Sequence, residues 1–89
     1  AVVWQVAPDH FFLRDAVAEM ARIVEDLATN APDGTFKAAE FRDKIGGGRK
    51  VAIQILEFFD RAGLTSLKNE RRTIDKVKLE RFVNRVGTS

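Results

Sequence analysis

The pattern of apolar and polar positions begins with two short runs of β-prone residues. Residues 1–6 and 11–13 are mostly apolar, and the turn-forming residues 7–10 separate them, which predicts a β-hairpin. An isolated hairpin is marginal in water, and the aromatic side chains of Trp4, Phe11 and Phe12 need a surface to cover them. We therefore expect residues 1–13 to remain from, or to link to, a preceding domain of a longer chain.

A helical period replaces this pattern after residue 13. Val17, Met20, Val24 and Leu27 recur on one helical face, which predicts a helix over residues 15–31 with Asp15 as its N-cap. The Ala-Pro-Asp-Gly stretch at residues 31–34 ends this helix, and residues 35–36 predict a short strand.

Two shorter helices are predicted on either side of three consecutive glycines. Residues 37–45 and 49–62 have apolar positions at helical spacing, and the glycines at 46–48 allow the chain to turn between them. Residues 37–62 therefore predict a helix-turn-helix. The expected inward residues are Ala38, Phe41, Ile45, Ala52, Ile55, Leu56 and Phe59, and the expected outer face of the second helix carries Lys50, Gln54, Glu57 and Arg61.

The rest of the chain predicts a wing and a last helix. Residues 64–68 and 71–74 predict two strands joined at Asn69-Glu70, and Asp75 is placed to cap a helix over residues 76–86. We expect its apolar stripe to close the core rather than to dock a partner helix; this stripe comprises Leu79, Phe82, Val83 and Val86. The predicted fold is mostly α with a small β-hairpin (α+β), a winged helix-turn-helix domain over residues 14–89.

Charge is divided unevenly along the chain. Residues 1–34 hold two basic and six acidic side chains, whereas residues 35–89 hold thirteen basic and seven acidic ones. A polyanion would therefore dock on the second part. A charged helix surface without a ligand explains the same numbers equally well, so the geometry of the bases has to decide.

The bases gather at the start of the helix over residues 49–62. Arg49 and Lys50 adjoin the three glycines, the free N–H groups and the positive end of the helix dipole, which favours capture of a phosphate or an extruded base end-on. Glu57 in the middle of the outer face disfavours a helix laid lengthwise in a DNA groove. A turn with two helix caps and no ligand is the alternative for the glycines. The predicted contacts are Arg42, Lys44, Gly47, Gly48, Arg49, Lys50 and, on the wing, Lys68, Arg71 and Arg72.

Several classes of function are disfavoured by composition. The chain has no cysteine and one histidine, so we expect no metal or cofactor in this segment. The close acids Glu25 and Asp26 belong on a solvated helix face, and His10 belongs in a turn, so we expect no catalysis. No apolar run approaches the roughly 20 residues that span a bilayer, and the start is not typical of a signal peptide, so we expect a cytoplasmic protein.

A dense set of residues resembles one known family. They are similar to the last winged-helix domain of the bacterial selenocysteine-specific elongation factor SelB. The matching residues are Ala39 to Asp43, Ile45-Gly46, Gly48 to Lys50, Ala52, Ile55 to Arg61 and Gly63 to Thr65. The passage Asp9 to Phe12 resembles, more weakly, the link between that family's last two winged helices. The last fifteen residues carry no such resemblance.

The resemblance implies an RNA-binding module. In that family, GTPase and selenocysteyl-tRNA-binding domains lie N-terminal, and tandem winged helices bind an mRNA hairpin that marks a UGA codon for selenocysteine. It implies GTP as the cofactor of the full-length protein, and the ribosome, selenocysteyl-tRNA and the preceding winged helix as its partners. The resemblance most strongly implies RNA contacts at Arg42, Gly48, Arg49 and Lys50. This agrees with an end-on site, because sequence readout in RNA usually targets unstacked bases of loops and bulges.

The chain departs from the family pattern at two places. Ser66 and Leu67 precede Lys68 where the family commonly has two or three bases, so we expect Arg71 and Arg72 to compensate from the other strand. Lys37 stands where threonine is common, which predicts loss of an N-cap and of a capping box with Glu40. A DNA-binding transcription regulator and a winged helix that contacts protein are the alternative functions.

Overall fold

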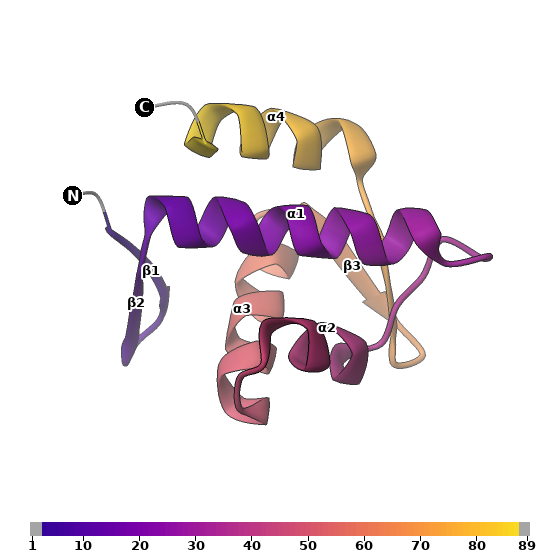
Figure 1. Cartoon of the computed structure of the whole chain (residues 1–89), viewed down its shortest axis with the longest axis horizontal. Coiled ribbons are helices and arrows are strands. Elements are labelled where there is room, and N and C mark those ends of the chain that lie inside the picture. The colour runs from indigo at the N-terminus through magenta and orange to yellow at the C-terminus, as the bar shows by residue number, and fades with distance from the viewer. Residues whose placement is uncertain (1–2, 88–89) are drawn as a thin grey trace.

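The computed structural model describes residues 3–87, with residues 1–2 and 88–89 outside the described part. Within residues 3–87, four helices and two antiparallel hairpins follow one another along the chain (Figure 1). Their bounds are β1 Val3–Ala7, β2 His10–Leu13, α1 Arg14–Asn30, α2 Ala38–Ile45, α3 Arg49–Arg61, β3 Thr65–Lys68, β4 Arg71–Ile74 and α4 Lys76–Gly87. The predicted α+β winged helix-turn-helix is confirmed.

The core forms around α1, which lies between α4 on one side and α2 with α3 on the other (Figure 1). Its buried residues include Val17, Ala21 and Val24, each with no exposed surface, because apolar side chains at helical spacing meet a partner on both sides. Burial of each large apolar side chain contributes about 1.5–3 kcal/mol. The partners that fill this core are Phe36, Phe41, Ala52, Ile55, Leu56, Phe59, Leu64 and Leu79.

The turn between α2 and α3 needs glycine at one of its three positions. Gly46 has φ 67° and donates its N–H to the carbonyl of Arg42 at 3.0 Å, which closes α2 with a left-handed cap. Gly48, the N-cap residue of α3, has φ −75°, which any residue adopts. In this turn, left-handed backbone therefore occurs at Gly46 and not at Gly48.

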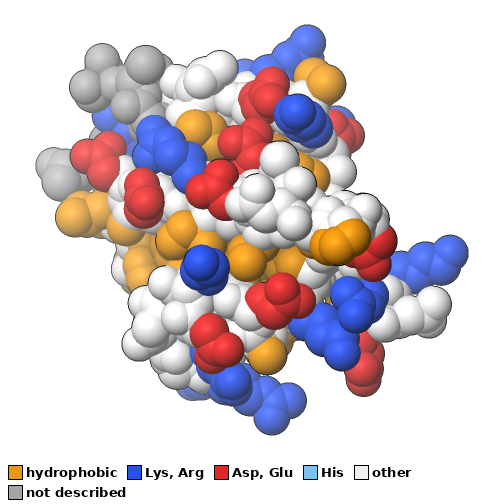
Figure 2. Space-filling view, turned by 45° about the vertical axis from the view of Figure 1, so that its right-hand side comes forward, with side chains coloured by type: hydrophobic (Ala, Val, Ile, Leu, Met, Phe, Trp, Pro, Cys, Tyr) orange, Lys and Arg blue, Asp and Glu red, His pale blue; other side chains and the backbone are white. Residues whose placement is uncertain are grey.

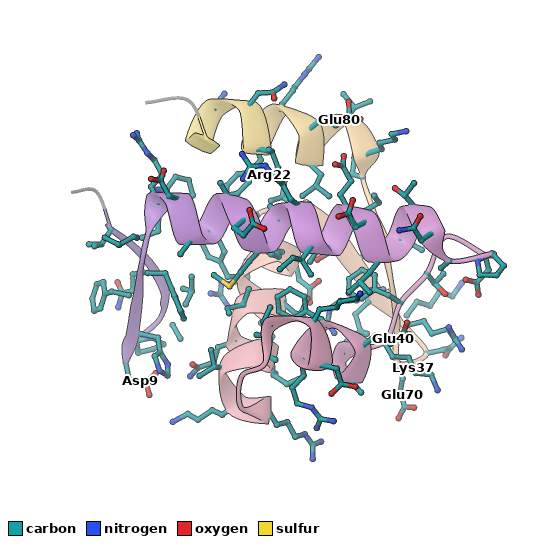
Figure 3. All side chains as sticks on the ribbon, viewed as in Figure 1. Asp9, Arg22, Lys37, Glu40, Glu70 and Glu80 are labelled. Carbon is teal, nitrogen blue, oxygen red and sulfur yellow. The ribbon has the colours of Figure 1, made fainter. Side chains whose placement is uncertain are left out.

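The starts of the helices correct two sequence predictions. Helix α1 begins at Arg14, so Asp15 lies in its first turn instead of capping it. At α2 the lysine side chain accepts nothing, but Glu40 Oε1 accepts the backbone N–H of Lys37 at 3.0 Å (Figure 3). This half of the capping box needs only a backbone donor, so it survives the change from threonine. Asp75 caps α4 as predicted, by accepting the N–H of Lys78 at 3.0 Å.

The wing is a two-residue hairpin. Asn69 and Glu70 both have positive φ, 52° and 66°, the conformation of a type I′ turn that matches the twist of paired strands. The predicted strand at residues 35–36 is a single bridge, in which Phe36 and Arg72 exchange backbone hydrogen bonds of 3.0 and 2.8 Å. This bridge ties the wing to the chain that enters α2.

The N-terminal hairpin packs on the same core as the helices. Trp4 meets the rings of Phe58 and Phe82 edge-on, with centroids 5.9 and 5.3 Å apart, and Phe12 also packs against the core. The covering surface that we expected for Trp4 and Phe12 thus lies within residues 3–87. Phe11 points the other way and is 59% exposed, because neighbouring strand residues face opposite sides.

Helix α4 closes the core along its apolar stripe, as predicted. Leu79 is fully buried, and Phe82 and Val83 are half-buried against the helices beneath. The side chain of Val86, the fourth predicted residue of the stripe, lies outside the described part of the structure.

Candidate nucleic-acid interface

The basic corner, residues 46–50, lies at the N-terminal end of α3. Arg49 and Lys50 occupy the first turn of this helix and are exposed, and no side chain within residues 3–87 caps it. Its first N–H groups therefore point to solvent beside two cations, and the helix dipole adds partial positive charge there. The arrangement is chemically suited to an anion such as phosphate.

Arg42 joins the basic corner from α2. It lies with Arg49 around a hollow of about 200 Å³, which is also lined by Ala38, Ala39, Ala52 and Ile53. Asp43 lies beside Arg42, with an oxygen 3.5 Å from its Nη2. The hollow thus places guanidinium groups at the edge of an apolar floor, a chemistry that suits a base and its phosphate. The predicted grouping of Arg42 with Arg49 is present in the structure.

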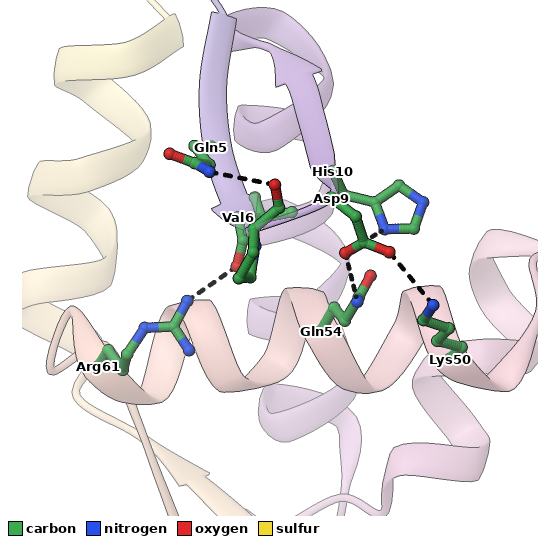
Figure 4. Close-up of polar contacts among 8 residues, drawn as sticks. Gln5, Val6, Asp9, His10, Lys50, Gln54 and Arg61 are labelled. Atoms are coloured by element: carbon green, nitrogen blue, oxygen red, sulfur yellow. Dashed lines mark hydrogen bonds and ion pairs between the residues drawn. The ribbon is translucent and has the colours of Figure 1, made fainter.

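The N-terminal hairpin covers part of the α3 face that was predicted to be free. Asp9 accepts hydrogen bonds from Lys50 Nζ at 3.2 Å and from Gln54 Nε2 at 3.1 Å, and Arg61 Nη2 donates to the carbonyl of Val6 at 2.8 Å (Figure 4). The hydrogen bond from Lys50 is the main cause that lowers the pKa of the Asp9 carboxyl. Lys50, Gln54 and Arg61 therefore face the hairpin, which the helical spacing alone did not reveal.

Lys44 and Arg71 line a different hollow from the one that Arg42 and Arg49 share. They line a groove of about 660 Å³ together with Ile23, Asp26, Leu27, Asn30, Ala31, Pro32, Asp33, Thr35 and Glu40, which we call the side groove. Lys44 faces it because residues two positions apart on a helix point about 200° apart, so Lys44 and Arg42 take opposite faces of α2. Lys44 therefore lines the side groove and not the hollow that Arg42 and Arg49 share, and its contact with RNA stays a prediction.

A turn holds Arg71 at the edge of the side groove. Asp33 accepts the backbone N–H of Thr35 at 3.1 Å and its hydroxyl at 2.9 Å, and Arg71 donates to that hydroxyl oxygen at 3.2 Å. The backbone hydrogen bond from Thr35 is the largest cause that lowers the pKa of Asp33. Arg71 remains about half exposed, with side-chain exposure of 46%, and can reach a ligand from this position.

Arg72 is a core residue, which corrects its predicted role in binding. It is 4% exposed, and its Nη2 lies 2.9 Å from Asp60 Oδ2 while its Nε donates to the same carboxylate. Thr65 also donates its hydroxyl to Asp60. Arg71 and Arg72 are neighbours on β4, so strand alternation sends one outward and the other inward. Arg72 stabilises the base of the wing and is not available to RNA.

The wing contributes one further predicted base, Lys68, at the end of β3. Lys68 is exposed and pairs across the strands with Arg71, so the two predicted cations lie beside the turn of the wing. Figure 2 shows Lys and Arg side chains at the lower and right-hand parts of one face and also across its upper part, with hydrophobic side chains between them. The exposed cations among the predicted contacts occupy two surfaces, the basic corner with Arg42 and the wing with the side groove.

The acidic side chains and the histidine of the described residues are spread over the surface. Within residues 3–87, no three His, Cys, Asp or Glu side chains are grouped so that they could hold a metal. His10 stacks on Phe12 with centroids 6.1 Å apart and lies near Asp9, which is a packing role. No helix among these residues is long and apolar enough to cross a membrane.

Asp9 and Gln54 make a contact beside the basic corner that the sequence did not predict. Asp9 was placed in a turn and Gln54 on a free helix face, and neither position signals a contact between residues 45 apart in the chain. Only the docking of the hairpin on α3 brings them together.

The fold and the basic corner define a winged helix-turn-helix domain with a cationic surface. A family model described as "Elongation factor SelB, winged helix" matches residues 29–74. The chain belongs to this family.

The proteins similar to the chain include two relatives and a solved structure. The selenocysteine-specific elongation factor of Escherichia coli (strain K12) is 42% identical over 64 residues, and that of Haemophilus influenzae is 35% identical over 63. These matches cover 72% and 71% of this chain but 10% of each relative, so the chain spans about a tenth of their length. The mRNA-binding domain of E. coli SelB, solved in complex with SECIS RNA, matches 82% of this chain and 59% of that one, with a TM-score of 0.76 and 37% identity.

Proposed function

We propose that this domain binds the selenocysteine insertion hairpin of a selenoprotein mRNA and so directs decoding of UGA. The observation that carries the proposal is the start of α3, where no side chain caps the helix, Arg49 and Lys50 occupy the first turn, and Arg42 and Arg49 line one hollow. The similarity to a domain solved with SECIS RNA supports the choice of RNA as ligand. The domain binds and does no chemistry of its own.

An end-on site suits RNA better than duplex DNA. Sequence readout in RNA targets unstacked bases in loops and bulges, and the hollow between Arg42 and Arg49 offers an apolar floor with cations at its edge. Exposed Glu57 lies farther along α3 and disfavours a helix laid in a major groove. The relatives are elongation factors, so nothing in the comparisons supports a DNA-binding transcription regulator.

We further propose that the domain acts as one part of a longer translation factor. In this proposal a GTPase, with GTP as its cofactor, and a selenocysteyl-tRNA site precede the domain. A preceding winged helix adjoins it, and the whole protein works on the cytoplasmic ribosome. Binding of the hairpin then raises the effective concentration of the tRNA complex at the UGA codon.

The test is a titration of the chain with a selenoprotein-mRNA hairpin and with hairpins altered in the loop or bulge. Arg49→Ala should weaken binding about tenfold or more, because a guanidinium contact is lost. The matched control is Arg22→Ala on α1, which removes the same charge far from the basic corner and should change affinity by about twofold or less (Figure 3).

Two results would contradict the proposal. Equal affinity for every hairpin would exclude specific recognition, and equal effects of the Arg49 and Arg22 substitutions would exclude the basic corner as the site. Tighter binding to duplex DNA than to the hairpin would favour the transcription-regulator alternative instead.

A further inference from the structure

An acidic side chain sits against the basic corner. Asp9, at the tip of the N-terminal hairpin, accepts from Lys50 at 3.2 Å and from Gln54 at 3.1 Å (Figure 4). Lys50 belongs to the first turn of α3, and Gln54 follows one turn later on the same face. The Asp9 carboxylate thus accepts from Lys50 and Gln54, the donors that an RNA phosphate would use on this side of the basic corner.

The contact is open to solvent and can be exchanged. The side chain of Asp9 is 53% exposed and that of Lys50 is 73% exposed, so a ligand can reach both without unfolding the domain. Carboxylate and phosphate oxygens are both charge-assisted acceptors for lysine. Such an exposed ion pair is weak on its own, and a polyanion can displace it.

The hairpin does not depend on Asp9 to stay in place. Arg61 Nη2 donates to the Val6 carbonyl at 2.8 Å, and Trp4 packs edge-on against Phe58 and Phe82. These contacts lie toward the other end of α3 and bury apolar surface, which an exposed hydrogen bond does not. Release of Asp9 from Lys50 therefore leaves the hairpin docked.

We propose that Asp9 is an intramolecular competitor of RNA phosphate for Lys50 and Gln54, and so sets the affinity and specificity of the basic corner. The inference rests on the proposed RNA-binding function. Asp9 keeps Lys50 from nonspecific phosphates, and an RNA of the right shape repays its displacement through the contacts at Arg42 and Arg49. The carboxylate thereby penalises nonspecific RNA more than the cognate hairpin.

The test compares wild type with Asp9→Asn on a selenoprotein-mRNA hairpin and on an unrelated hairpin, across a salt series. Asparagine keeps an oxygen for Gln54 but loses the charge, so affinity for the unrelated hairpin should rise about two- to fivefold and that for the cognate hairpin less. Freed Lys50 should steepen the salt dependence by about one counterion. Asp15→Asn is the matched control, because it also removes an exposed carboxylate. Asp15 lies in the first turn of α1, after the end of β2, whereas Asp9 lies just before the start of that strand.

A double-mutant cycle separates competition from a general charge effect. Lys50→Ala should cost more affinity in the Asp9→Asn background than in wild type, because only there is the lysine free for RNA. The fluorescence of Trp4, the single tryptophan of the chain, should stay unchanged in Asp9→Asn and so report an intact hairpin.

The outcomes are distinct. Wild-type binding with no gain from Asp9→Asn, or the same gain from Asp15→Asn, would overturn this inference and leave the proposed function standing. A shifted Trp4 spectrum in Asp9→Asn would also overturn it, because Asp9 would then hold the hairpin. No specific binding by wild type would overturn the proposed function and this inference with it.

Discussion

The neighbours Arg71 and Arg72 should respond in opposite ways to truncation, although both were predicted from the sequence to bind RNA. Arg72→Ala removes a 4% exposed guanidinium that makes hydrogen bonds of 2.9 to 3.3 Å to both oxygens of Asp60. Breaking a buried ion pair costs about 3–5 kcal/mol. Asp60 keeps 24% of its side chain exposed, so water compensates in part and about 2–3 kcal/mol is expected.

This loss is large for a domain of 89 residues. Domains of this size have a free energy of unfolding of roughly 4–13 kcal/mol, and 1 kcal/mol shifts the melting temperature by about 4–8 °C. Arg72→Ala should therefore lower the melting temperature by roughly 10–20 °C. Arg71→Ala should change the free energy of unfolding by about 0.5 kcal/mol or less and should weaken hairpin binding.

The assay is chemical and thermal unfolding followed by circular dichroism, with hairpin binding measured on the folded variants. Arg72→Ala should also cost less in an Asp60→Ala background, because no stranded carboxylate then remains. Equal melting temperatures for the Arg71 and Arg72 variants would refute the assignment of Arg72 to the core. Full additivity with Asp60→Ala would refute the ion pair as its cause.

Three further predictions concern the hairpin and the turns. Trp4→Ala should cost about 2–3 kcal/mol in denaturant titrations, because it strips the hairpin of its edge-on ring contacts, whereas Phe11→Ala should cost about 0.5 kcal/mol or less; similar losses would argue against docking. Gly46→Ala should cost about 1 kcal/mol at its φ of 67° and Gly48→Ala almost nothing, and the reverse order would exclude the left-handed cap. The hydrogen bonds from Thr35 lower the pKa of the Asp33 carboxyl from 3.8, so the carboxylate stabilises the fold above pH 3.8 and this stabilisation is lost as the pH falls through the lower folded pKa. Asp33→Asn should therefore reduce the fall in melting temperature at acidic pH, and an unchanged fall would contradict the turn contact.

Much of the fold could be predicted because local rules agreed with one another. Apolar spacing located the helices, Asn69-Glu70 located the wing turn, and Asp75 marked the start of α4. The basic corner was also predictable, because a helix start, a glycine turn and two cations coincide within five consecutive residues. Each of these signals lies within a few residues of the feature it predicts.

The site could be predicted less completely, because its members come from segments far apart in the chain. Helical spacing gave Lys50 an outward position, but not the hairpin that lies on it. Strand alternation between Arg71 and Arg72 was visible, yet which one faces inward depended on the register of β4 against β3 and Phe36. Lys44 and Arg42 were separated by the face of α2 that packs on α3.

The sequence by itself determined the elements of this domain, the cationic character of its second part and the position of the basic corner. These depend on period, turn chemistry and charge, which act over a few residues. The tertiary structure alone decided that Arg72 is buried on Asp60 and that Asp9 reaches Lys50 across 41 residues of chain. Both contacts arise from packing, which brings distant residues together and turns a surface charge into a core ion pair or a competitor for a ligand.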